Sequence, residues 1–296
     1  MATTLSVEKK SGQRLQVWLA AAGALLLLYF GWSALFGLEP VNFCTGLIIP
    51  ALGPAAKALY DTSNVNIIYL YEPFECQRLL RGMGMTIYLS FVCVVASVVI
   101  GVLGAWAQMS KSKLLRGFTQ SYIQFFRNTP PLVQMYFFFF ALSPLLPRVM
   151  TDYGIARPMF DAFTWAAISL SFFAGAFNVE IFRSGIEAVP RTMTEAAESL
   201  GFTRAQVFRR VVLPLALRVC IPSLTNNLVN LVKTTTLAFA ISVPEALFVA
   251  NQIWSDRVNV LEMMLTLFAF YIGLVAVLVW MMDRWEKSLR IPGYGR

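Results

Sequence analysis

The sequence predicts an all-α fold, a polytopic membrane helix bundle of about six transmembrane helices with a helical loop on the cytoplasmic side. Hydrophobic residues make up 57% of the 296 residues and charged residues only 14%, whereas soluble proteins carry about 25% charged residues. The apolar residues gather in long stretches, each close to the roughly 20 residues that a helix needs to cross a bilayer. Lipid is therefore the main solvent of this chain.

Six stretches have the required length and polarity. The predicted spans are 15–38, 84–108, 119–145, 161–185, 214–240 and 260–282. A loop rich in proline separates the first span from the second, and a polar segment with helix signals of its own separates the fourth from the fifth. The predicted parts are an N-terminal helix with an outer loop (1–83), the main transmembrane domain (84–285) with its cytoplasmic loop (187–214), and a cytoplasmic tail (286–296).

The distribution of lysine and arginine predicts the orientation. If the N-terminus is inside, 17 of the 24 basic residues lie in the cytoplasmic segments or toward the cytoplasmic ends of the spans, the outer segments hold six, and Lys233 lies within a span. Positive residues collect on the cytoplasmic side of membrane proteins. We therefore expect a multi-pass protein with both termini in the cytoplasm, and we interpret the net charge of +8 as a topology signal, with no nucleic acid as partner.

Residue types that carry catalysis or bind metals are scarce. The sequence has no histidine and no CxxC pair, so neither a metal site nor a catalytic residue is predicted. Cys44 and Cys76 both fall in the predicted outer loop, where an oxidising compartment permits a disulfide. Two free thiols are the alternative, and the sequence leaves both open.

The cytoplasmic loop carries signals for two short helices. Thr192 and Glu195 have the spacing of a capping box, and Gly201 suits the left-handed position after a helix end. Thr203 and Gln206 repeat the capping spacing for a second helix, predicted to end near Val212, before Pro214. An ordinary connection between two helices is much shorter, so we expect this loop to have a function.

Seven residues of the loop also keep a specific spacing: Glu195, Ala196, Ala197, Gly201, Val211, Leu213 and Pro214. This set resembles the EAA loop of bacterial ABC importer permeases, which couples the permease to its ATPase. Three further segments resemble the polar amino-acid branch of that family: FFRNTPPLVQ (125–134), NVEIFRSGIEAVP (178–190) and NLVKTTTL (230–237). Asn128 and Thr236 stand where the family usually has glycine and serine. The resemblance covers about residues 80–285 and leaves the role of 1–80 open.

The resemblance implies a function and a set of partners. The chain would be the transmembrane permease of an ATP-binding-cassette importer that translocates polar amino acids in the bacterial inner membrane. It implies a second permease, identical or homologous, two ATP-binding subunits, a solute-binding protein that is periplasmic or lipid-anchored, and membrane lipid. No GxxxxGK[ST] pattern occurs here, so no cofactor is expected in this chain, and the partner ATPase would bind ATP and Mg. A permease for an amino-acid derivative such as an opine, or an ion-coupled secondary transporter, is the alternative.

Polar side chains within the spans are candidates for the substrate pathway, because polar groups in a membrane face a partner or water. Interhelical hydrogen bonding is the competing interpretation. The candidates are Thr129, Gln134, Ser171, Asn178, Asn226, Asn227, Asn230, Lys233, Thr234 and Thr235. Glu180 and Arg183 lie one turn apart, and we interpret them, with Arg127 as a third member, as an ion pair that fixes the loop more than as a substrate site.

Overall fold

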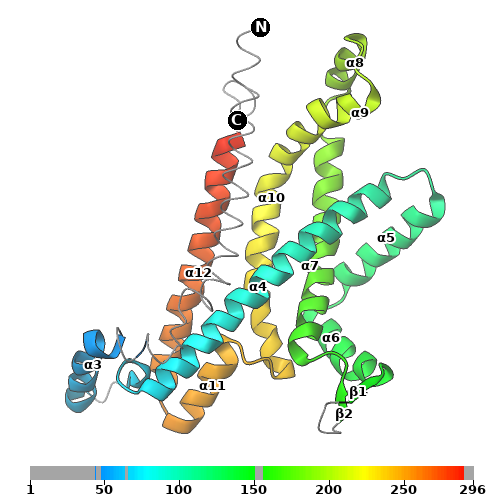
Figure 1. The fold of residues 1–296 in the computed structure, drawn as a ribbon. Helices are drawn as coiled ribbons and strands as arrows, with labels where there is room; N and C mark the ends of the chain where they lie inside the picture. The colour runs from blue at the N-terminus through cyan, green and yellow to red at the C-terminus, as the bar shows by residue number, and fades with distance from the viewer. Residues whose placement is uncertain (1–43, 45–47, 64–65, 151–155, 290–296) are drawn as a thin grey trace. The chain divides into compact units, whose positions relative to one another are not determined.

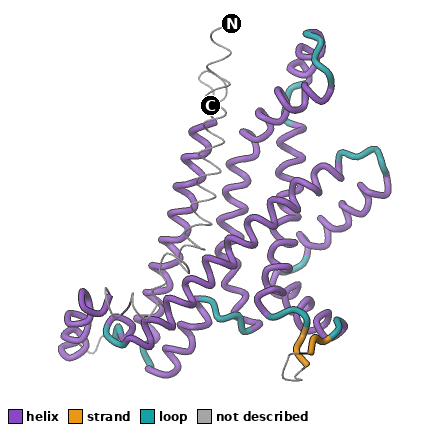
Figure 2. The backbone as a smooth tube through the Cα atoms, viewed as in Figure 1, coloured by secondary structure: helices purple, strands orange, loops and turns teal. Residues whose placement is uncertain are grey.

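The computed structural model describes residues 44, 48–63, 66–150 and 156–289, and the all-α prediction is confirmed for them (Figures 1 and 2). The predicted first span, 15–38, lies outside the described residues. The chain divides into two compact units, Met1–Arg81 and Gly82–Arg296.

The described part of the first unit is a short helix followed by the start of a long one. Helix α3 (Ile49–Ser63) is succeeded by a 3-10 turn (Ile68–Leu70) and by the first residues of α4 (Pro73–Gln108). Small residues form the inner side of α3: Ala56 is buried, and the backbone of Gly53 lies close to the carbonyl oxygen of Leu70. The sequence did not predict α3, because its apolar run is shorter than a span.

The second unit holds the helices that we expected to cross the membrane. Helices α4, α7 (Ala162–Glu187) and α12 (Val260–Leu289) are long and apolar enough to do so among the described residues. Helix α10 (Leu213–Thr234) takes the place of the predicted fifth span and continues as a 3-10 turn (Thr235–Ile241). The helix that contains the predicted second span, 84–108, begins earlier than the span, at Pro73, because proline is tolerated in a first helical turn and the polar residues that follow remain helical.

The predicted third span, 119–145, is divided into two helices. Helix α5 (Lys113–Asn128) ends where Thr129 and Pro130 adopt extended backbone angles, and α6 (Pro131–Tyr136) begins directly afterwards. Helix α6 runs on through π-type turns (Phe137–Leu142) and a 3-10 turn (Ser143–Leu145). Proline disfavours the helical conformation of the residue before it, so two adjacent prolines enforce the break.

Three shorter elements complete this unit. A hairpin of two antiparallel strands, β1 (Arg148–Met150) and β2 (Ala156–Pro158), follows α6. Helix α11 (Ala246–Arg257) precedes α12. Neither was predicted, since both are short and carry polar residues. Figure 1 places α11 and the hairpin at one end of the bundle, and α8 (Arg191–Ser199) and α9 (Arg204–Val207) at the other, where α12 also ends.

The interior of the bundle is formed by close contact of α4, α7 and α10. Ser97, Gly101 and Ala105 repeat every four residues on α4 and are all buried. The backbone of Gly101 lies so near Asn178 and Phe182 of α7 that no β-carbon fits there. Small residues at this spacing let membrane helices approach closely. Two clusters of buried apolar side chains fill the rest, one around Leu89, Met135 and Trp165 and the other around Leu224 and Leu228.

Candidate functional site

The turn between α8 and α9 is closed by Gly201. Its φ angle is +82°, in the left-handed region that favours glycine. The amide of Phe202 donates to the carbonyl oxygen of Ala197 at 3.2 Å, and the amide of Gly201 donates to that of Glu198 at 2.9 Å. These two bonds form a Schellman motif, which satisfies the last carbonyl groups of α8. The chain therefore leaves α8 in one defined direction.

The two predicted helix caps had different outcomes. The capping box of Thr203 and Gln206 is present: the Thr203 hydroxyl accepts from the Gln206 amide at 3.4 Å, and the Gln206 side chain accepts from the Thr203 amide at 2.8 Å. The predicted capping box of Thr192 and Glu195 was wrong. Helix α8 begins at Arg191, directly after Pro190, because the fixed φ of proline already directs the chain into a first turn.

A small apolar core holds the loop together. Ala197, Val207 and Val212 are buried, with Ile186 and Phe202 packed against them, and the Arg210 guanidinium lies 5.7 Å from the centre of the Phe202 ring. Of the coupling residues expected from the sequence, Ala197 thus faces inward. Glu195, Ala196, Gly201, Leu213 and Pro214 are exposed.

We expected the second helix of the loop to end near Val212, but it continues beyond that residue. Helix α9 passes into a π-type turn (Phe208–Val212) and then directly into α10. Proline lacks the amide that an α-helix needs, and the wider π-type turn just before Pro214 accommodates that loss. The loop and the fifth span are consequently one continuous helical rod from Arg204 to Thr234.

Several candidate pathway residues instead hold the bundle together. Asn178 is fully buried, donates to the Ser97 hydroxyl at 3.2 Å and accepts from the Asn227 amide at 2.8 Å. Gln134 is buried at the break between α5 and α6, where its amide donates to the carbonyl oxygens of Phe126 and Thr129, each at 2.9 Å. These amides form hydrogen bonds between helices, which supports the competing interpretation of these polar residues.

The hydroxyl candidates bond mainly within their own helices. Thr129, Thr234 and Thr235 donate to the carbonyl oxygens of Phe125, Asn230 and Val232, respectively. Ser171 and Thr235 are buried.

A different subset forms an exposed stripe on α10. Asn226, Asn230 and Lys233 are spaced by four and three residues, and all three are exposed. Residues at this spacing share one helix face. It is costly for a polar helix face to contact lipid. This stripe therefore remains a candidate for a water-filled path or for a contact with another chain.

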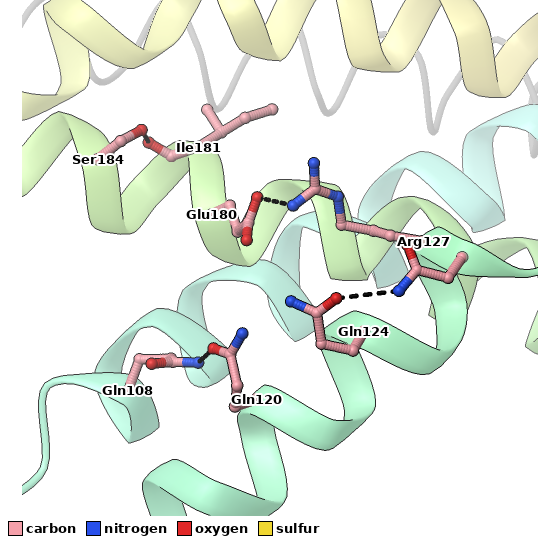
Figure 3. Close-up of polar contacts among 8 residues, drawn as sticks. Gln108, Gln120, Gln124, Arg127, Glu180, Ile181 and Ser184 are labelled. Atoms are coloured by element: carbon pink, nitrogen blue, oxygen red, sulfur yellow. Dashed lines mark hydrogen bonds and ion pairs between the residues drawn. The ribbon is translucent and has the colours of Figure 1, made fainter.

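The predicted ion pair of Glu180 with Arg183, with Arg127 as third member, was wrong in its partners, because the two arginines belong to separate pairs. Arg127 of α5 binds Glu180 of α7, and these side chains point toward one another in Figure 3. Arg183 does not join them. It binds Glu187, one turn further along α7, at 2.8 Å, because an arginine four residues before a glutamate on one helix reaches it without a second helix.

The two cysteines of the predicted outer loop are joined. Cys44 and Cys76 form a disulfide with Cα atoms 6.1 Å apart, whereas Cys93 and Cys220 are buried free thiols. Within the described residues, no group of three or more cysteine and acidic side chains is arranged to hold a metal ion.

Comparison with known proteins decides the family. Residues 83–291 match the family described as the binding-protein-dependent transport system inner membrane component. The chain belongs to this permease family. Family membership decides against the ion-coupled secondary transporter among the alternatives drawn from the sequence. The matched range also begins almost where the second compact unit begins, at Gly82.

Individual relatives point in the same direction. The probable amino-acid ABC transporter permease protein PatM of Vibrio harveyi is 34% identical over 200 residues, covering 68% of this chain and 86% of PatM. The histidine/lysine/arginine/ornithine transport system permease protein HisQ of Escherichia coli is 35% identical over 159 residues, covering 54% and 70%. A crystal structure of an amino acid ABC transporter with histidines matches with a TM-score of 0.62 at 28% identity, covering 72% of this chain and 94% of that one.

Sequence reasoning missed a buried acidic residue that joins three helices of this permease. Glu245 is fully buried and caps α11 by accepting from the amides of Leu247 and Phe248 at 2.9 and 2.8 Å. The hydroxyls of Thr86 on α4 and Tyr271 on α12 also donate to it, at 3.3 and 3.0 Å. Glu245 thereby ties three helices together. Its position just before an apolar run is a weak cap signal, and glutamate is not among the favoured N-cap residues.

Proposed function

We propose that this permease is the membrane-spanning subunit of an importer for a polar amino acid, in which a separate subunit binds and hydrolyses ATP. The observation that carries the proposal is the α8–α9 element. It is a helix, a left-handed glycine turn and a second helix with a capping box, at one end of the bundle (Figure 1). A loop that only joins two spans has no need of that structure.

The outer surface of this element suits a protein cleft. The Leu200 side chain is 78% exposed at the tip of the turn, and Met193 and Phe208 are also exposed. The Glu195 carboxylate lies on the same short helix. Exposed apolar side chains beside a charge are typical of a surface that is covered in an assembly. We infer that the ATPase subunit covers it, and that this subunit holds ATP and Mg in its own P-loop.

The connection to α10 supplies a transmission path. Because α9 runs into α10 without an interruption from Arg204 to Thr234, a tilt of the loop tilts the fifth span with it. When ATP closes the two ATPase subunits, the attached helices move as rigid bodies. This movement switches the side of the membrane to which the bundle is open. The exposed stripe of Asn226, Asn230 and Lys233 lies on the helix that moves, which favours a role in the substrate pathway.

The proposed assembly contains two permeases, two ATPase subunits and a solute-binding protein. The polar stripe on α10 supports the second permease, since a partner chain and the water between two chains shield such groups from lipid. The second permease is identical or homologous, and the binding protein is periplasmic or lipid-anchored.

We infer the bacterial inner membrane as location, with the α8–α9 element in the cytoplasm. The charge distribution of the sequence supports this orientation, because 17 of the 24 lysine and arginine residues then lie inside or toward the cytoplasmic ends of the spans. The disulfide of Cys44 and Cys76 supports it as well, since disulfides persist in oxidising compartments. Both termini are then cytoplasmic.

Co-purification with a ligand screen tests the assembly and the substrate class. The affinity-tagged permease is extracted from its native membrane in mild detergent, and the proteins recovered with it are identified by mass spectrometry. We expect an ATP-binding subunit, and we expect the solute-binding protein encoded beside it to bind a polar amino acid. Recovery of an intact permease pair without any ATPase contradicts the assembly. Binding of an opine, with no amino acid bound, contradicts the substrate class alone.

A further inference from the structure

A pair of opposite charges lies on a partly open face of the bundle. Arg127 is at the last turn of α5, and Glu180 is inside α7. Their side chains are 36% and 30% exposed. In the inferred orientation both lie toward the cytoplasmic ends of their spans, where charged groups face water or a partner at less cost than lipid. This exposure therefore favours a face that is open to water over one that is covered by lipid.

The surroundings of the pair are polar as well. Gln108 of α4 donates to Gln120 of α5 at 2.9 Å, and Asn128 donates to Gln124 at 3.0 Å. Figure 3 shows the amides of Gln108, Gln120 and Gln124 on the α4 and α5 side of the pair, with Glu180 opposite on α7. Amide side chains offer both donors and acceptors, so the band can bind groups of either charge.

The two helices that carry the pair are fixed independently of it. The Tyr122 hydroxyl of α5 donates to the carbonyl oxygen of Phe172 on α7 at 2.6 Å, and the Phe126 ring stacks on the Phe172 ring with centres 5.7 Å apart. The contact of α5 with α7 thus does not depend on the ion pair. The pair is free to serve another purpose.

Both members retain binding capacity. A guanidinium has five N–H donors in a planar fork, and a carboxylate has two oxygens. The bond between them joins one arginine nitrogen to one carboxylate oxygen. The Arg127 guanidinium also lies 5.3 Å from the centre of the Phe177 ring, which orients its plane. The remaining N–H groups match a second carboxylate, and the remaining oxygen of Glu180 matches an ammonium.

We propose that Arg127 and Glu180 bind the charged backbone of the transported amino acid, Arg127 its α-carboxylate and Glu180 its α-ammonium. This inference rests on the proposed function and adds a site to it. In the empty protein the two residues neutralise each other. A zwitterion replaces each partner with one of the same charge, so neither residue is left unpaired during the exchange. A substrate that lacks one of the two charges leaves one residue of the pair without a charged partner and should therefore bind more weakly.

Variants of the reconstituted importer test the proposal. The permease, its ATPase and its binding protein are placed in proteoliposomes, and uptake of radiolabelled L-histidine, L-arginine and L-glutamine is measured. We expect Arg127→Gln and Glu180→Gln to reduce uptake by about tenfold to a hundredfold, the size of a lost hydrogen bond to a charged group. The matched control is Arg183→Gln, which removes the neighbouring pair with Glu187 and should leave uptake within about twofold, as for an exposed helix pair.

The charge-exchanged variant separates a substrate site from a structural bridge. Arg127→Glu with Glu180→Arg keeps an ion pair between the same helices, so the melting temperature should match that of the unaltered protein. Uptake should stay low, because each charged group of a substrate bound in the same orientation then faces a residue of like charge. Full recovery of uptake in this double variant would overturn the proposal, and so would normal uptake in both single variants.

A measurement on the unaltered protein avoids any dependence on folding of the variants. Phenylglyoxal modifies accessible arginines, and peptide mass spectrometry reports each one. L-Histidine and L-glutamine, where transported, should each protect Arg127, while their N-acetyl amides should not, and Arg183 should react equally in all samples; L-arginine is left out because its own guanidinium consumes the reagent. Equal modification of Arg127 with and without a transported amino acid refutes the site. The absence of ATP-dependent uptake by the unaltered importer, by contrast, refutes the proposed function itself.

Discussion

Replacement of Gly201 by valine changes the turn between α8 and α9 with little effect elsewhere. Gly201 has a φ of +82°, and no neighbouring atom lies within 4 Å of the position that a β-carbon would take. A side chain there meets no obstacle in space. The only cost is that of holding an L-residue in the left-handed conformation, so the substitution tests the direction of the turn alone.

The magnitude follows from that conformation. The left-handed helical region costs an L-residue about 1–2 kcal/mol, and valine, branched at its β-carbon, belongs at the upper end. A change of one or two kcal/mol alters an equilibrium by about 5–30-fold. We therefore expect the population of the native turn, relative to turns that point α9 elsewhere, to fall by that factor. The apparent affinity for the ATPase should fall by the same factor.

The assay compares three substitutions at matched expression. Gly201→Val should insert into the membrane normally but recover less ATPase on purification and take up less substrate. Gly201→Asn should lie near the unaltered protein, because asparagine tolerates the left-handed region. Gly117→Val is the control: Gly117 also has open space around it but lies within the α5 helix, where valine is at least as favourable as glycine.

The order of these variants decides the result. If Gly201→Val, expressed at the normal level, recovers the ATPase and transports substrate like the control, then α8 and α9 are not a coupling element. A loss of activity in Gly117→Val of the same size would show that the assay reports general damage.

Three further predictions concern the orientation, the disulfide and the buried amide network. A cysteine introduced at Arg257 should react with a membrane-impermeant thiol reagent on intact cells and one at Arg204 should not; labelling at Arg204 reverses the orientation. Peptide mapping without reductant should recover Cys44 and Cys76 in one linked fragment, and free thiols at both positions contradict the bond. Asn178→Ala should destabilise the purified permease by about 1–2 kcal/mol, as interhelical hydrogen bonds in membranes contribute. An unchanged melting temperature contradicts that role.

The loop between α7 and α10 shows how far local sequence signals extend. Gly201 and the pair Thr203 and Gln206 act within one or two turns, so their spacing was enough to predict the turn and the second helix. The start of α8 was misplaced, because Pro190 begins the helix without a side-chain cap. The continuation of the helix through Pro214 was also not predicted, since a π-type turn just before a proline has no distinct sequence signal.

The polar residues of the spans show what periodicity cannot decide. Asn178 and Asn230 have the same residue type and similar surroundings in sequence. One is fully buried against Ser97 and Asn227, and the other is exposed. Helical spacing predicts which residues share a face, but whether a neighbouring helix fills that face depends on tertiary packing. The same limit hid Glu245, whose partners Thr86 and Tyr271 come from two distant helices.

The most direct test of the central claim is the energy source of transport. The permease, its ATPase and its binding protein are reconstituted into sealed proteoliposomes with ATP on the side of α8 and α9, and amino-acid uptake is followed with ionophores present. We predict uptake that requires ATP and the binding protein, that persists when ion gradients are dissipated, and that falls in Gly201→Val. Uptake that proceeds without ATP and stops when the ion gradients are removed would contradict the account.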